Sequence, residues 1–151
     1  MLGFGNVLLC DDGAGVQILG QLGCELSPDS AQLIDAGTLS FSLLPYIEAA
    51  NSVLAIDAAD INDRAGAIAI YEGEAMDEFL RSTRRRTVHE VGLIDLLDMA
   101  RLRDCLPSRR ALLCIQPGLI DWSERLSPPV AAALPVAVRQ ASALLQRWQT
   151  S

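Results

Sequence analysis

The amino-acid sequence predicts a three-layer α/β fold: a mostly parallel, twisted sheet of about five strands with helices on both faces. Short apolar runs rich in Val, Ile and Leu alternate along the chain with longer stretches whose apolar residues recur at helical spacing, which is the pattern of such a fold. The chain has 151 residues and is 50% hydrophobic, which suits one domain with a sizeable core. We therefore expect a single domain over residues 1–151.

Each element is predicted from its own pattern. Strands are expected where apolar runs are short and rich in branched side chains, namely a stub at Leu2–Phe4 and the segments 31–35 (AQLID), 52–57 (SVLAID), 67–71 (AIAIY) and 111–116 (ALLCIQ). Helices are expected where the apolar spacing is helical, namely over Ala14–Leu26, Phe41–Ala50, 74–81, Val91–Leu102 and Pro129–Trp148. Proline lacks a backbone N–H and belongs at element boundaries, but Pro45 falls inside an expected helix. We expect that helix to begin late or to be kinked.

The charge balance excludes several classes of function. The formal net charge is −7, so attraction to nucleic-acid phosphates or to an anionic membrane surface is disfavoured. All 12 basic residues are arginine, so the chain has neither a Schiff-base lysine nor the lysine of a phosphate-binding loop. The expected partner is a small molecule or another protein, and we expect the chain to act as a monomer.

The cysteines and the first residues indicate the compartment. The four cysteines, at positions 10, 24, 105 and 114, form no Cys-x-x-Cys pair, and in so apolar a chain we expect buried thiols in a reducing compartment. The opening segment MLGFGNVLLC is apolar, but it has no basic leader and is too short to span a bilayer. We therefore expect a cytoplasmic protein.

Aspartates lie at the ends of three predicted strands. Asp11 and Asp12 follow the first strand, Asp35 ends the second, and Asp57 and Asp60 lie at the end of the third. Ligand sites in open α/β sheets form outside the carboxyl ends of the strands, so parallel strands would gather these carboxylates at one edge. Taken singly, each aspartate is better explained as a helix cap or a turn residue. The whole set together is harder to explain in that way.

The single histidine, His89, adds an imidazole to these carboxylates and so completes a candidate metal site. Gathered carboxylates repel each other, and a cation is the simplest compensation. His89 lies in the segment TVHEVGLIDLLDM, just before a predicted helix, at a junction that a site on the sheet edge can reach. Two carboxylates and one imidazole suit zinc, nickel or iron rather than calcium. A lone histidine is more often a hydrogen-bonded structural residue, and this alternative stays open.

Three other patterns indicate different chemistry. The segment GFGN begins like a dinucleotide-binding fingerprint, but Leu8 stands where the third glycine is required and the loop is acidic. A cysteine or serine nucleophile paired with His89 lacks a Gly-x-Ser-x-Gly elbow, and acidic neighbours disfavour the Cys10 thiolate. The basic run RSTRRR over 81–86 is either a solvated loop or a docking loop for an acidic partner.

Four segments together resemble the hydrogenase maturation endopeptidases, which process the large subunit of nickel-iron hydrogenases. GFGNVLLCDDGAGV resembles that family's Gly-x-Gly-Asn-x-Leu-x-x-Asp-Asp/Glu-x-x-Gly-Val signature, and LIDAGT and LAIDAAD resemble its second and third strand ends. HEVGLIDLL resembles its His-x-x-Gly-Leu-x-Asp-x-Leu segment, so the order and approximate spacing hold across roughly the first 100 residues. The segment CIQPGLIDWSERLSPPVAAALP resembles the final strand, loop and helix.

The resemblance implies an endopeptidase that removes the C-terminal extension of the hydrogenase large-subunit precursor after nickel insertion. In the family, an acidic residue of the first loop, an aspartate that ends the third strand and the histidine bind the metal. Carried over by motif, these implied metal-binding and catalytic residues are Asp12, Asp57 and His89. The implied nickel is supplied by the precursor, which is the implied partner. Asp11 is then a neighbour that orients Asp12 or tunes its charge.

One departure from the family and two competing functions accompany this interpretation. Family members carry several more apolar residues before the Gly-x-Gly-Asn motif, where they form a central strand, whereas Met1 nearly abuts the motif here. We expect either a first strand shortened to a stub or a start site set too late. The competing functions are a non-catalytic, metal-dependent binding or chaperone module for the same precursor and a general metallohydrolase with permanently bound zinc.

Overall fold

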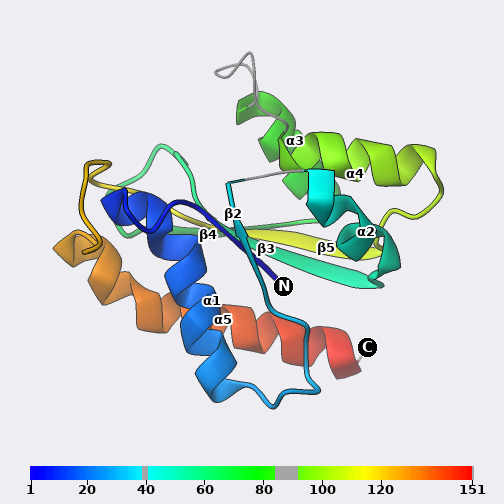
Figure 1. Cartoon of the computed structure of the whole chain (residues 1–151), viewed down its shortest axis with the longest axis horizontal. Coiled ribbons are helices and arrows are strands. Elements are labelled where there is room, and N and C mark those ends of the chain that lie inside the picture. The colour runs from blue at the N-terminus through cyan, green and yellow to red at the C-terminus, as the bar shows by residue number, and fades with distance from the viewer. Residues whose placement is uncertain (39–40, 84–91, 151) are drawn as a thin grey trace.

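The computed structural model describes residues 1–38, 41–83 and 92–150 and confirms the predicted α/β class. Five strands form one sheet: β1 (Leu2–Phe4), β2 (Ile34–Gly37), β3 (Ser52–Ala58), β4 (Ile68–Glu72) and β5 (Arg109–Ile115). Their order across the sheet is β2-β1-β3-β5-β4 (Figure 1). The first three strands and β5 are parallel, whereas β4 pairs antiparallel with β5 at one edge.

Helices cover both faces of this sheet. One layer contains α1 (Ala14–Glu25) and α5 (Pro128–Thr150), and the other contains α2 (Leu44–Ala49), α3 (Glu74–Thr83) and α4 (Leu93–Leu102), as Figure 1 shows. Two short 3-10 helices, η1 (Cys10–Gly13) and η2 (Phe41–Leu43), precede α1 and α2. Each helix layer encloses a separate hydrophobic core against its face of the sheet.

Strand β3 shows why the sheet is buried on both faces. Its residues Val53 and Ala55 lie in the core with α2 and α4, while Leu54 and Ile56 lie in the core with α1 and α5. Successive side chains of a strand point to opposite faces, so an unbroken apolar run can pack on both. The run stops at Asp57, near the carboxyl end of the strand.

The first turn of α1 packs directly on the backbone of the sheet. A Cβ atom on Gly15 would lie 2.3 Å from the Ile56 carbonyl oxygen and 2.4 Å from that of Phe4, so only glycine fits there. Gly5 has a φ of +119°, and a Cβ atom there would lie 1.7 Å from the Asp12 carbonyl oxygen. Glycine adopts such a conformation without steric cost. These two glycines let the chain turn after β1 and return closely along the sheet, which sets the position of η1.

A buried cluster of charges ties α3 and α4 to strand β5. Asp77 on α3 is buried and accepts hydrogen bonds from Arg110 Nε at 2.9 Å and Nη2 at 2.7 Å. Arg101 Nη2 on α4 donates to the same carboxylate at 2.6 Å. Burial alone would raise the pKa of Asp77, but Arg110 and then Arg101 outweigh it and lower that pKa below its usual value. The carboxylate is therefore kept ionised inside the fold.

Some element boundaries differ from the prediction for local reasons. Strand β2 begins at Ile34, three residues after the predicted start, because its pairing with β1 begins where the Ile34 N–H donates to the Met1 carbonyl at 2.9 Å. Helix α2 begins at Leu44 with Pro45 in its first turn, so the predicted late start is confirmed. The proline inside a helix is instead Pro135, which lies at an exposed position of α5.

The prediction of buried thiols is wrong for two of the four cysteines. Cys10 and Cys114 are buried, but Cys24 and Cys105 are exposed, and all four are free. Cys24 lies near the end of α1, on the side that faces away from the core. Its position on the helix, and not the apolar character of cysteine, therefore determines its exposure. Across the described ranges, no helix combines the length and the apolar character needed to cross a bilayer.

Replacing Gly15 by alanine is predicted to destabilise the fold by about 1–3 kcal/mol or more. The new methyl group would collide with two backbone carbonyls that cannot move independently. Gly20 lies on the same helix, and a Cβ atom added there would meet nothing within 4 Å. At that position, alanine should raise the free energy of unfolding by up to about 1 kcal/mol through helix propensity. Urea unfolding of both variants measures this difference, and equal stabilities for the two would contradict the packing argument.

The Asp77 cluster predicts a loss of stability in acid. Because the Asp77 pKa is lower in the folded than in the unfolded state, the ion pairs stabilise the fold above the ordinary carboxyl pKa and this stabilisation is lost as the pH falls through the folded pKa. Asp77→Asn should cost about 3 kcal/mol at neutral pH, and its deficit relative to the wild type should shrink below about pH 4. Asp98→Asn, which removes the partially exposed Arg81 and Arg101 pairs, is the control and should cost under about 1 kcal/mol.

Candidate functional site

The chain reverses direction across the sheet between β1 and β3. From β1 it crosses through α1 to β2 on one side, and from β2 it returns through α2, past β1, to β3 on the other. Ligands of open α/β sheets bind outside the carboxyl ends of the strands at such a switch point. Here the switch point lies between the loop that follows β1, which contains Asp12, and the end of β3, which contains Asp57.

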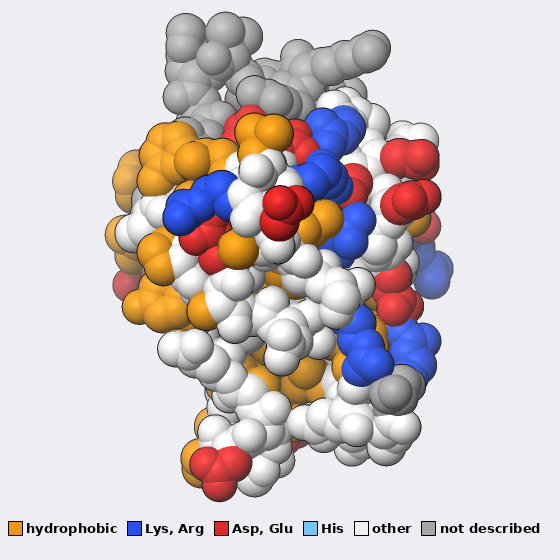
Figure 2. Space-filling view, turned by 90° about the vertical axis from the view of Figure 1, so that its right-hand side faces the viewer, with side chains coloured by type: hydrophobic (Ala, Val, Ile, Leu, Met, Phe, Trp, Pro, Cys, Tyr) orange, Lys and Arg blue, Asp and Glu red, His pale blue; other side chains and the backbone are white. Residues whose placement is uncertain are grey.

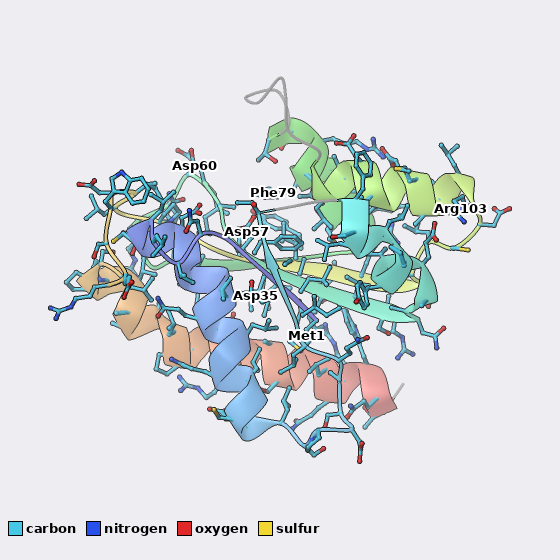
Figure 3. All side chains as sticks on the ribbon, in the orientation of Figure 1. Met1, Asp35, Asp57, Asp60, Phe79 and Arg103 are labelled. Atoms are coloured by element: carbon cyan, nitrogen blue, oxygen red, sulfur yellow. The ribbon has the colours of Figure 1, made fainter. Side chains whose placement is uncertain are left out.

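Asp12 and Asp57 are close enough at this point to interact electrostatically. Figure 3 shows Asp57 at the end of its strand, next to the loop that follows β1. Burial raises the pKa of Asp57 to about 7 with a further contribution from the negative charge of Asp12, while a hydrogen bond from the Ala58 N–H acts in the opposite direction. Asp12 is held by the backbone, because its Oδ2 accepts a hydrogen bond from the Asn6 N–H at 2.7 Å. The structure thus brings two of the three predicted ligands together.

Asp11 has a structural role that differs from that of its neighbour. Its side chain is completely buried, and it accepts hydrogen bonds from the N–H groups of Gly118 and Leu119, both at 2.8 Å, and from the N–H and hydroxyl of Ser127, both at 2.7 Å. Ser127 directly precedes α5, so the carboxylate also lies at the positive end of that helix. Burial opposes ionisation, but these donors prevail and lower the pKa of Asp11. Asp11 therefore fastens η1 to the loop after β5.

Asp35 and Asp60 each stabilise a turn, which is the explanation that the sequence favours for a single aspartate. Asp35 Oδ1 accepts a hydrogen bond from the Gly37 N–H at 3.0 Å, and Asp60 Oδ1 accepts one from the Asn62 N–H at 3.0 Å. Both are local turns of the kind that aspartate favours after a strand. Figure 3 shows Asp60 on the loop beyond β3, farther along the chain than Asp57. Of the carboxylates predicted at this edge, Asp12 and Asp57 are the pair that interacts at the switch point.

His89 and most of the basic run lie outside the described residues. His89 and residues 84–86 fall in the gap between positions 83 and 92, so their predicted roles stay predictions. Arg81, at the start of the run, belongs to α3 and forms an ion pair with Asp98 on α4, with Nη2 and Oδ1 2.6 Å apart. Within the residues that the structure describes, no group of three His, Cys, Asp or Glu side chains could hold a metal ion.

The donor chemistry of the pair suits a cation. Two carboxylates whose charges disfavour each other gain free energy when a cation lies between them. They provide oxygen ligands with open coordination positions, and an imidazole from another segment would complete a set suited to nickel, zinc or iron. Asp12 and Asp57 therefore fit the predicted metal-binding role.

The buried cysteines give no support to a thiol nucleophile. Cys114 pairs in register with Asp57, and burial together with the Asp57 charge raises the pKa of its thiol. The Cys10 thiol donates to the Arg125 carbonyl at 2.9 Å, and the residue has a φ of +52°. A thiolate nucleophile needs a lowered pKa and access to the substrate. Cys10 instead helps to hold the loop after β5 in place.

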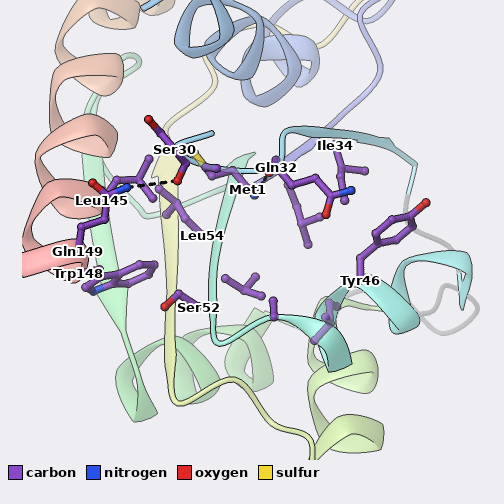
Figure 4. Close-up of a pocket in the computed structure, with 15 residues that line it drawn as sticks. Met1, Ser30, Gln32, Ile34, Tyr46, Ser52, Leu54, Leu145, Trp148 and Gln149 are labelled. Atoms are coloured by element: carbon purple, nitrogen blue, oxygen red, sulfur yellow. Dashed lines mark hydrogen bonds between the residues drawn. The ribbon is translucent and has the colours of Figure 1, made fainter. Parts of the chain in front are cut away.

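A pocket lies at the other end of the sheet. It has a volume of about 260 Å³ and lies at the amino ends of β1 and β3, where Met1, Ser52 and Trp148 line it (Figure 4). Pairing of β1 with β3 starts only at Leu2 and Ala55, so the first residues of β3 border this hollow. Among the described residues, those that line this pocket include no carboxylate and no histidine. Asp12 and Asp57 therefore lie at the opposite end of the sheet from this pocket.

Comparison with known proteins agrees with this arrangement. The family model described as "Hydrogenase maturation protease" matches residues 16–144. The chain is 31% identical to the hydrogenase expression/formation protein HupD of Rhodobacter capsulatus, covering 98% of this chain and 71% of HupD. It is 33% identical to HoxM of Cupriavidus necator, covering 97% of this chain and 73% of HoxM.

A solved structure extends this likeness to three dimensions. The hydrogenase maturating endopeptidase HybD of Escherichia coli superposes with a TM-score of 0.84 at 29% identity, covering 97% of this chain and 90% of HybD. The match includes the five-stranded sheet and both helix layers that place Asp12 beside Asp57. Sequence and fold thus lead to one conclusion: this chain belongs to the hydrogenase maturation protease family, a family of peptidases.

Proposed function

We propose that this protein removes the C-terminal extension of a nickel-iron hydrogenase large-subunit precursor after nickel insertion, and that Asp12, Asp57 and His89 recognise the precursor's nickel. Membership of the maturation protease family supports the reaction and the kind of partner. The observation that carries the site is the pairing of the Asp12 and Asp57 carboxylates at the switch point of the sheet.

The reaction is the hydrolysis of one peptide bond. The water oxygen bonds to the carbonyl carbon, the carbon–nitrogen bond breaks, and the departing amine takes a proton. Asp12 and Asp57 hold the nickel-bearing part of the precursor at the sheet edge, which keeps a nearby peptide bond in a fixed position for attack. The cargo metal supplies the polarising charge of a Lewis acid. Asp11 acts only through the backbone, by fixing the turn that presents Asp12.

The pair of carboxylates explains how cleavage would wait for the metal. Without a cation, the Asp12 and Asp57 charges disfavour each other, and together they disfavour the approach of a carbonyl oxygen. With nickel in the precursor, the same charges attract it. The protein then binds a loaded precursor in preference to an empty one, because only the loaded precursor brings a cation that the two carboxylates attract.

The first test compares nickel-loaded with nickel-free precursor. Purified protein should shorten the loaded precursor and leave the empty one intact, as measured by mass spectrometry of the precursor before and after incubation. Cleavage of both forms alike would contradict nickel recognition. Binding of the loaded precursor without any loss of mass would favour the binding or chaperone module over the peptidase, and zinc bound stoichiometrically before substrate is added would favour a general metallohydrolase.

The second test replaces the three proposed ligands one at a time. Asp12→Asn, Asp57→Asn and His89→Ala should each slow cleavage of the loaded precursor by about 100-fold or more, because each removes a charge or ligand aimed at the reacting centre. Asp57→Asn should unfold at the same or a higher temperature than the wild type, since it removes a desolvated carboxylate that Asp12 repels.

Asp63→Asn is the matched control for these variants. Asp63 is exposed on the loop that follows β3, where its Oδ1 accepts a hydrogen bond from the Arg64 N–H at 2.6 Å, so its replacement should leave cleavage within about twofold of the wild type. Unchanged processing by His89→Ala would show that this histidine is structural. Wild-type processing by Asp57→Asn would remove the proposed role of the carboxylate pair.

A further inference from the structure

Two loops beside Asp12 expose a group of large apolar side chains. The loop after β1 exposes Val7 at 41% and Leu8 at 46%, and the loop after β5 exposes Leu119 at 49%, Ile120 at 53% and Trp122 at 78%. We call these five residues the apolar rim. Single exposed apolar residues need no explanation, but a group of them on neighbouring loops marks an interaction site.

The two loops are bound firmly to each other. Leu9 and Ser123 form a parallel β-bridge, in which the Ser123 N–H donates to the Leu8 carbonyl at 3.0 Å and the Cys10 N–H donates to the Ser123 carbonyl at 2.6 Å. The Asp11 N–H also donates to the Leu119 carbonyl at 3.2 Å. The rim is therefore a preformed surface, and a partner that binds it has little loop ordering to do.

The apolar rim is continuous with the carboxylate pair. Val7 and Leu8 belong to the same short segment as Asp12, and the Asn6 N–H that directly precedes them holds the Asp12 carboxylate. A chain that brings a metal to Asp12 therefore comes close to Val7 and Leu8. Under the proposed function the scissile bond is held near this metal, so the residues beside that bond are the ones within reach of the rim.

The charges around the rim indicate the composition of its partner. Apart from the buried Asp11, the segments 5–13 and 117–125 carry Asp12, Asp121 and Glu124 against the single cation Arg125. Asp121, Glu124 and Arg125 are exposed. A segment with basic residues among apolar ones complements this surface, whereas an acidic segment would be repelled.

We propose that the apolar rim is the docking surface for the segment of the precursor next to the scissile bond, and that this segment is apolar with basic residues. This inference rests on the proposed function and adds a second contact that is independent of the metal. The rim supplies binding through apolar contact, while the carboxylates respond to the cargo.

The direct test observes the rim by fluorine NMR. The protein is labelled with 5-fluorotryptophan, which gives two signals, one from Trp122 in the rim and one from Trp148 in the pocket at the opposite end. A Trp122→Phe variant assigns them. Addition of unlabelled, nickel-loaded precursor should change the chemical shift of Trp122 and leave that of Trp148 in place. A shifted Trp148 with an unshifted Trp122 would overturn the proposal.

The kinetic test separates docking from chemistry. Leu8→Ser and Trp122→Ser should each raise KM for the loaded precursor by about tenfold or more, with kcat within about twofold, because each removes apolar contact made before and during the reaction. Leu102→Ser is the control: Leu102 is 86% exposed and is the last residue of α4. The face of the molecule at that end of α4 carries acidic and basic side chains among apolar ones (Figure 2). This variant should behave as the wild type.

The outcomes distinguish this inference from the proposed function. Cleavage by the wild type with unchanged KM in both rim variants overturns the docking surface and leaves the peptidase intact. Complex formation without cleavage, accompanied by a Trp122 shift, keeps the docking surface and overturns the peptidase. Absence of both binding and cleavage overturns the two together.

Discussion

The buried carboxylate of Asp11 connects the beginning of the chain to its end, and the rest of the candidate site depends on it. Four hydrogen bonds reach it from the loop after β5 and from Ser127 at the start of α5. Those backbone N–H groups need an acceptor once water is excluded, and an anion at a helix N-terminus is the favourable one. Because η1 presents Asp12 and the attached loop presents the larger part of the apolar rim, one carboxylate fixes both surfaces.

Adjacent aspartates in this turn have opposite energetic roles. Asp11 is surrounded by donors, which lower its pKa and make its ionised form stabilising. One residue later, Asp12 faces Asp57 and shares a region where a second negative charge is unfavourable. The fold carries that cost because α1 is held against the sheet at Gly15 and the Asp77 cluster supports the opposite helix layer. These stabilising contacts, which lie away from the switch point, offset the free-energy cost of the Asp12 and Asp57 pair.

The sequence was sufficient to predict the fold class, because alternating apolar runs depend only on local periodicity. It also placed Asp57 correctly at a strand end. It could not show that Asp11 is structural, since the partner Ser127 is 116 residues away and no periodic pattern reports so distant a contact. The segments PGL and SPP do read as a turn and a helix start, but nothing local indicates that both donate to one carboxylate. The apolar rim was missed for the same reason, because its two halves meet only in the folded chain.

Under the proposed function, the apolar rim and the carboxylate pair would together make the peptidase selective. Recognition of the metal alone would not distinguish one nickel protein from another, and recognition of an apolar segment alone would not distinguish a loaded precursor from an empty one. Because part of the rim and Asp12 belong to the same turn, the second contact would form within the complex made by the first, at high effective concentration.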